Sequence, residues 1–151
     1  MSLQRRIILG GLLWALLTTF IGAFAVTRVF DQIADRRFDL LLEERHNQVI
    51  AAIGGARNFD DLQVFLTDPA YDRAYSGRYW QIAGPGGERL TSPSLFDSEL
   101  QIIQSEQPIY WEGRGPSGWV RGRSEIILTE AGTVLNVAVA ENLSALTAER
   151  Q

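Results

Sequence analysis

Residues 78–92, RYWQIAGPGGERLTS, decide the fold of the region in which they lie. Two short runs rich in aromatic, β-branched and aliphatic residues flank the glycine-proline-glycine-glycine sequence at 84–87. This pattern predicts two antiparallel strands joined by a slightly long hairpin connection. Because the glycines lie between two predicted strands, and not between a strand and a helix, they form a turn and no phosphate-binding loop.

Three further segments downstream, residues 109–113, 119–128 and 134–140, alternate in polarity or are β-branched, and we expect them to be antiparallel strands. Residues 94–107, which Pro108 closes, are predicted to form a short helix. The fold class is therefore α+β, with about five antiparallel strands. We expect one face of the sheet to pack on the stalk helix that precedes this region and the other to be covered by loops.

The N-terminal part carries an apolar run of 20 residues without a charge, at positions 7–26. As a helix it spans about 30 Å, the thickness of a bilayer's hydrocarbon core. Arg5 and Arg6 precede it, which places the N-terminus in the cytoplasm and the rest of the chain outside the inner membrane. The sequence Ala23-Phe24-Ala25 resembles a signal-peptidase site, but the run is longer than a signal peptide's apolar core, which favours an uncleaved anchor.

Helical spacing of apolar residues continues beyond the anchor as far as the glycine pair Gly54 and Gly55, a plausible stop. The predicted organisation is a cytoplasmic tip and membrane helix (1–26), a stalk helix (27–55), a sensor domain (56–141) and the start of an exit helix (142–151). The amphipathic half of the stalk fits pairing with a second copy or packing against its own domain, and both alternatives stay open.

Several kinds of chemistry are excluded by composition. The chain has no cysteine and one histidine, which leaves no zinc or copper site, and it lacks a Gly-x-Ser-x-Gly motif for nucleophilic hydrolysis. From residue 27 onward 12 arginines face 18 acids, a net charge of −6, which argues against nucleic-acid binding. His46 lies between charged neighbours and is predicted to be a solvated surface residue, with pH sensing as the alternative.

Candidate binding residues come from two patterns. Alternation places Trp119, Arg121 and Arg123 on one sheet face, and Arg78 and Trp80 share a face of their own strand. Guanidinium groups beside indole rings could bind a small carboxylate, whereas the alternative is arginine stems lying over tryptophans on a solvated face. A weaker pattern is an aspartate cluster that could hold calcium or magnesium, or could simply keep a loop solvated, formed by Asp60, Asp61, Asp68 and Asp72.

Three stretches together resemble the periplasmic input region of proteobacterial transmembrane sensor histidine kinases. They are a serine-glycine-aromatic-tryptophan-glutamine strand, a following Ser-Leu-Phe segment, and a closing valine-alanine … leucine … leucine helix that in this family feeds the second membrane span. In this sequence these features are Ser76, Gly77, Tyr79, Trp80 and Gln81, then Ser94, Leu95 and Phe96, and finally Val137, Ala138, Leu143 and Leu146.

The resemblance implies a PAS-like domain of the PDC type, a homodimer, and transmission of a small-molecule or ion signal through membrane helices to a response regulator. It implies an inner-membrane protein with residues 27–151 in the periplasm. No kinase histidine box, asparagine box or ATP lid is present, so we expect a non-enzymatic input part of a longer kinase, whose missing part would use ATP and magnesium. The alternative is a single-span anchored, or secreted, periplasmic binding or interaction domain without a kinase.

Overall fold

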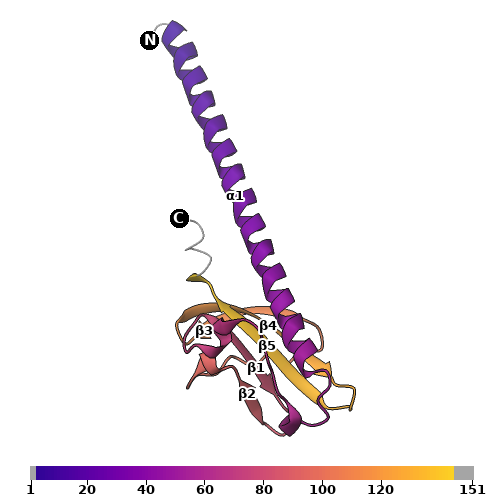
Figure 1. Ribbon diagram of the computed structural model, residues 1–151. Helices are drawn as coiled ribbons and strands as arrows, with labels where there is room; N and C mark the ends of the chain where they lie inside the picture. The colour runs from indigo at the N-terminus through magenta and orange to yellow at the C-terminus, as the bar shows by residue number, and fades with distance from the viewer. Residues whose placement is uncertain (1–2, 145–151) are drawn as a thin grey trace. The chain divides into compact units, whose positions relative to one another are not determined.

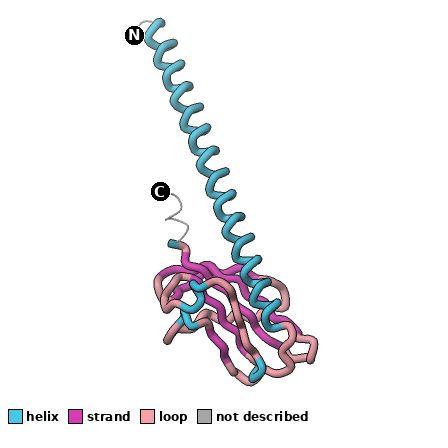
Figure 2. Tube along the Cα trace, in the orientation of Figure 1, coloured by secondary structure: helices cyan, strands magenta, loops and turns pink. Residues whose placement is uncertain are grey.

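The computed structural model describes residues 3–144 (Figures 1 and 2). The chain divides into two compact units, residues 1–39 and 40–151. A helix, α1 (Leu3–Ile53), supplies the first unit and the beginning of the second. The predicted exit helix falls almost wholly outside the described residues.

In the first unit α1 is a lone helix whose side chains from position 7 to position 30 are all exposed. Within the described residues it is the one helix long and apolar enough to cross a membrane. The predicted stop is confirmed, because α1 ends at Ile53 and Gly54 and Gly55 form a turn after it.

The second unit is built on a five-stranded sheet of β1 (Arg78–Ala83), β2 (Arg89–Thr91), β3 (Ile109–Gly115), β4 (Gly118–Leu128) and β5 (Val134–Asn142). The strand order is β2-β1-β5-β4-β3, and every neighbouring pair is antiparallel. Three short 3-10 helices accompany it, η1 (Phe59–Asp61), η2 (Pro69–Asp72) and η3 (Pro93–Leu95). The predicted α+β, PAS/PDC-like fold is confirmed, and β5, the last strand, occupies the centre of the sheet.

The hairpin between β1 and β2 turns as the glycines predict. The amide of Gly84 donates to the carbonyl of Glu88 at 2.8 Å, and Gly87 adopts a φ of 88°, which favours glycine. The side chain of Glu88 accepts from the amide of Gly86 at 2.8 Å, which fixes the tip of the turn.

One face of the sheet, which we call the helix face, is covered by residues 40–53 of α1. Leu42, His46, Val49 and Ile53 are fully buried at spacings of four, three and four, a single helical stripe. The predicted packing of the stalk helix on the sheet is thus confirmed for this part of α1. Homodimer formation through the stalk stays a prediction.

The opposite face, the loop face, is covered by residues 92–108. A buried core forms there from Tyr79, Leu95, Leu100, Trp111, Val120, Ala138 and Ala140. The prediction of a helix over residues 94–107 is wrong, since only the turn at η3 is helical. The reason is that the side chain of Gln81 binds both backbone groups of Leu100, accepting from its amide at 2.8 Å and donating to its carbonyl at 3.4 Å. An extended segment can present those groups to the sheet, and a helix would use them internally.

Candidate functional site

A chain of ion pairs runs across one end of the helix face. Arg45 of α1 pairs with Glu141 of β5, and Glu141 accepts from Nε of Arg78 in β1 at 3.1 Å. Nη1 of Arg78 donates to Asp68 at 2.5 Å, and Asp68 accepts in turn from the amide of Ala70 at 2.9 Å, capping η2. We call these four charged residues, Arg45, Glu141, Arg78 and Asp68, the ion-pair chain.

The ion-pair chain is partly withdrawn from water. The side chain of Glu141 is 9% exposed and that of Arg45 is 16% exposed. Burial, together with the neighbouring charge of Arg78, lowers the pKa of Arg45, and the amide of Ala70 and the guanidinium of Arg78 lower the pKa of Asp68. Since a half-buried charge that loses its partner is left poorly solvated, the two arginines and two acids stabilise each other as a set.

His46 forms the second link between α1 and β5. Its Nε2 lies 3.2 Å from the carbonyl oxygen of Val137, so this nitrogen carries the proton and donates. Its Nδ1 lies 3.9 Å from a carboxylate oxygen of Glu125 and has no hydrogen-bond partner within the described part of the chain. Burial lowers the pKa of His46 to about 4, so the ring is neutral at neutral pH.

The prediction that His46 is a solvated surface residue is therefore wrong. It lies four residues after Leu42 and three before Val49, on the buried stripe of α1. Its charged neighbours in sequence misled the prediction, because Glu43 and Arg45 themselves reach over to pair with the sheet.

Arg123 of β4 provides the third link. Its guanidinium lies 3.2 Å from Glu43 of α1 and donates to the hydroxyl of Tyr110 at 3.0 Å, and it also lies over the Tyr110 ring. The residues 40–53 of α1 are thereby bonded to β4 through one ion pair and to β5 through Arg45 and His46.

The predicted ligand-binding residues do share one sheet face. Strand pairing places Arg78 and Arg121 opposite Glu141, and Trp80 and Arg123 opposite Val139. Residues paired across antiparallel strands point to the same side, and this side is the helix face. Trp119 lies two residues before Arg121 in β4, and 58% of it is exposed. The guanidinium carbon of Arg114 lies 5.8 Å from the centre of the Trp119 ring.

Several of these side chains already have protein partners. Arg78 and Arg123 are ion-paired as described, Arg121 lies 3.3 Å from Glu112, and Trp80 is buried. Their ligand-binding role as a group stays a prediction, and of the five, Arg78 lines the polar cavity described below.

The predicted metal-binding aspartates lie in or directly before two separate 3-10 helices. Asp60 and Asp61 lie in η1 and are exposed, Asp72 lies in η2, and Asp68 is engaged by Arg78. Across residues 3–144 no group of three or more histidine, cysteine, aspartate or glutamate side chains is arranged to hold a metal ion. The metal role remains a prediction.

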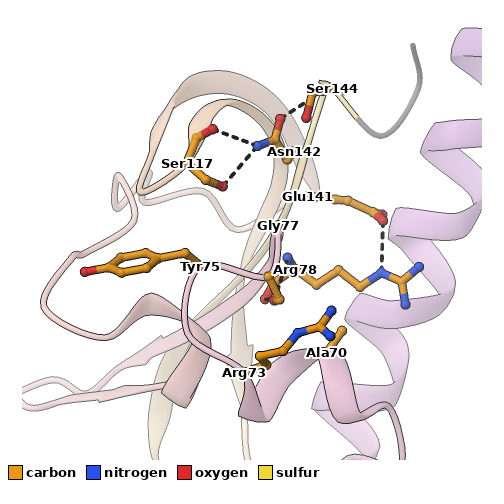
Figure 3. A pocket seen from close by; sticks show the side chains of 10 residues that line it. Ala70, Arg73, Tyr75, Gly77, Arg78, Ser117, Glu141, Asn142 and Ser144 are labelled. Atoms are coloured by element: carbon orange, nitrogen blue, oxygen red, sulfur yellow. Dashed lines mark hydrogen bonds and ion pairs between the residues drawn. The ribbon is translucent and has the colours of Figure 1, made fainter. Parts of the chain in front are cut away.

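A polar cavity of about 580 Å³ opens beside the ion-pair chain (Figure 3). Its walls come from the segment before and at the start of β1, the turn between β3 and β4, and the end of β5. The lining residues are Ala70, Arg73, Tyr75, Ser76, Gly77, Arg78, Ser117, Glu141, Asn142 and Ser144.

Asn142 organises one wall of this cavity. Its amide nitrogen donates to the carbonyl and to the hydroxyl of Ser117, both at 3.1 Å, and its amide oxygen accepts from the backbone of Ser144 at 2.8 Å, as Figure 3 shows. The last contact is of the kind that caps the first turn of a helix, and the predicted exit helix (142–151) lies almost wholly outside the described residues. The hydroxyl of Ser117 also lies 2.7 Å from that of Tyr79.

Tyr75, which lines the cavity, has a positive φ angle of 58°, a region that non-glycine residues rarely occupy. Phe96, which does not line the cavity, has a positive φ angle of 54°. Their rings meet edge to face with centroids 5.8 Å apart, and the Tyr75 hydroxyl donates to Asp97 at 3.0 Å. Residues held in strained conformations cluster at binding sites, because the surrounding structure must keep them there.

The sequence did not reveal Arg73, Ser117 or Asn142 as neighbours. They are separated by tens of residues, and only the register of β1, β4 and β5 brings them together. The glycine at position 77, with a φ of 94°, was a local signal that the chain turns sharply at this point.

A long apolar helix that continues into an α+β, PAS/PDC-like domain, and is bonded there to the central strand, fits a sensor-type input region. The sequence of the chain is also similar to that of a known sensor protein. Over 102 residues, or 67% of its length, the chain is 34% identical to the sensor protein kinase CarS of Pseudomonas aeruginosa. The matched stretch makes up 22% of that protein. This similarity supports a sensor-kinase-like region and, with the apolar helix, an association with a membrane.

No protein-family model matches the chain. No solved structure matches it either.

Proposed function

We propose that the chain is the extracytoplasmic signal-sensing region of a membrane sensor histidine kinase of a two-component system. The observation that carries this proposal is the direct bonding of α1 to β5. Arg45 pairs with Glu141, and His46 donates to the carbonyl of Val137. In a sensor whose first membrane helix enters the domain and whose last strand leads out of it, these bonds join the entry and the exit of the domain.

In the proposed mechanism a signal changes the relative position of α1 and β5. A small molecule or ion that binds one arrangement of the sheet and loops more tightly shifts a two-state equilibrium, by no more than its difference in affinity for the two states. The displacement passes through the membrane helices to a kinase part that uses ATP and magnesium and phosphorylates a response regulator. Residues 27–151 are periplasmic in this proposal, with Arg5 and Arg6 on the cytoplasmic side.

The proposed active form is a homodimer. Leu40 and Leu41 of α1 are largely exposed although the same helix buries Leu42 against the sheet. An apolar edge of this kind, on a helix that continues from a membrane segment, suits contact with the same helix of a second copy.

Topology and gene structure test the proposal together. Alkaline phosphatase fused after Gly54 or after Asn142 is expected to be active, and green fluorescent protein at the same places dark. The gene is expected to continue past codon 151 with a second apolar run, a histidine-bearing helical pair and an ATP-binding domain. A stop codon there, with active phosphatase fusions, would instead support the anchored binding domain without a kinase.

A further inference from the structure

The lining of the polar cavity holds two arginines and one acid, although the domain as a whole is negatively charged. Its walls and the adjoining ion-pair chain hold three arginines, Arg45, Arg73 and Arg78, against the two acids Asp68 and Glu141. The chain from residue 27 onward carries a net charge of −6 by count of its residues. A local excess of positive charge in such a domain attracts anions and repels cations.

Arg73 is the source of that excess. Its side chain is exposed at the cavity, and its guanidinium makes no hydrogen bond or ion pair with any residue in the range 3–144. The other lining arginine, Arg78, is held by Asp68 and Glu141. A planar guanidinium with free donors is suited to the two oxygens of a carboxylate or phosphate.

The rest of the lining fits a small ligand with anionic oxygens. Ser76 and Ser117 supply hydroxyl groups and Ala70 an apolar side chain. The volume of about 580 Å³ lies within the range of small-molecule sites.

We propose that this cavity binds a small oxyanion through Arg73 and Arg78, and that the anion competes with Glu141 for Arg78. Glu141 also holds Arg45 of α1, so an anion that takes Arg78 leaves Glu141 with Arg45 as its remaining ion-pair partner. Occupancy of the cavity thus changes the bonding between β5 and α1. The signalling consequence rests on the proposed function, whereas the binding does not.

The test is a calorimetric titration of the full chain in detergent, with sodium succinate and sodium phosphate as separate probes and glycerol as the uncharged control. We expect at least one of the two anions to bind with a 1:1 stoichiometry and glycerol not to bind. Succinate alone would identify a carboxylate site, and phosphate alone a phosphate site. Binding of neither anion would overturn the proposal.

Variants assign the binding to this cavity. Arg73→Ala is expected to lower the affinity for the anion by about 10- to 100-fold, since hydrogen bonds to a charged group contribute roughly 1.5–3 kcal/mol. The matched control is Arg57→Ala, which removes an exposed arginine that does not line the cavity, and it should stay within about twofold of the wild type. An equal loss of anion affinity in the two variants, or no loss in Arg73→Ala, would overturn the assignment of the anion to this cavity.

Competition at Arg78 is tested by Glu141→Gln. Removing the competing charge should raise the affinity for the anion several-fold, because anion binding at Arg78 and the breaking of the Glu141–Arg78 pair are reciprocally linked. Glu112→Gln, which removes an exposed carboxylate paired with Arg121, should leave the affinity unchanged. If Glu141→Gln binds no more tightly than Glu112→Gln, the competition is refuted. All these readouts use the chain alone, so they hold or fail independently of whether a kinase follows.

Discussion

The surroundings of His46 predict how strongly the free energy of unfolding depends on pH. The ring of this α1 residue is fully buried against β5. Burial lowers the pKa of His46 from 6.5 to about 4, and the charge of Arg123 acts in the same direction. The hydrogen bond to Val137 and the charge of Glu43 oppose this, and the carboxylate of Glu125 lies 3.9 Å from Nδ1. In the unfolded chain the histidine titrates near its ordinary value.

The direction in which stability changes with pH depends on whether the folded or the unfolded chain binds more protons. Above pH 6.5 the ring is neutral in both states, so its titration contributes no penalty. Between pH 6.5 and 4 the unfolded chain is protonated first, and stability therefore falls as the pH falls. Below the folded value the full difference of about 2.5 pKa units is lost, on the order of 3 kcal/mol.

The assay is urea unfolding of the detergent-solubilised chain, followed by tryptophan fluorescence, at several pH values between 7 and 4. The control is His46→Gln, whose amide can still donate to Val137 but does not titrate. Carboxylates titrate similarly in both proteins, so the difference between the two unfolding free energies isolates the histidine. We expect the wild type to lose more stability than the variant on acidification, and parallel curves would refute the assigned burial of a neutral ring.

Two further substitutions test the packing of the loop face. Gly122→Ala should destabilise the domain by about 1–3 kcal/mol, because the added methyl group would collide with the Trp111 indole. Gly55→Ala meets no atom and should be near neutral in the same urea titration, so equal midpoints for the two variants would contradict this packing. Gln81→Leu removes both bonds to the backbone of Leu100 and should lower the unfolding free energy by roughly 1–3 kcal/mol per group left unpaired. Unchanged hydrogen exchange of the Leu100 amide in that variant would show that the bond does not hold the segment.

The strands and the end of the helix were predictable because their signals are local. The turn glycines at 84–87, the alternation along β4 and the glycine pair after Ile53 each act within a few residues. These patterns also predicted correctly which layers cover the two faces of the sheet.

The errors have a common cause in contacts that are distant in sequence. His46 was misplaced because its charged neighbours find partners on strands about 80 to 100 residues away. The segment after η3 was predicted as a helix because its composition permits one, but Gln81 bonds to its backbone from β1. The free guanidinium of Arg73 becomes meaningful only once strand register brings Ser117 and Asn142 to the same cavity.

In the proposed mechanism the bonds between α1 and β5 carry the signal, and autophosphorylation of the full-length gene product in liposomes tests this role. The variant Arg45→Met breaks the pair with Glu141, and Arg89→Gln breaks an exposed pair with Glu99 at the edge of the sheet. We expect a several-fold change in autophosphorylation rate for Arg45→Met and none for Arg89→Gln. Equal rates in the wild type and both variants, or a full-length product without autophosphorylation, would contradict it.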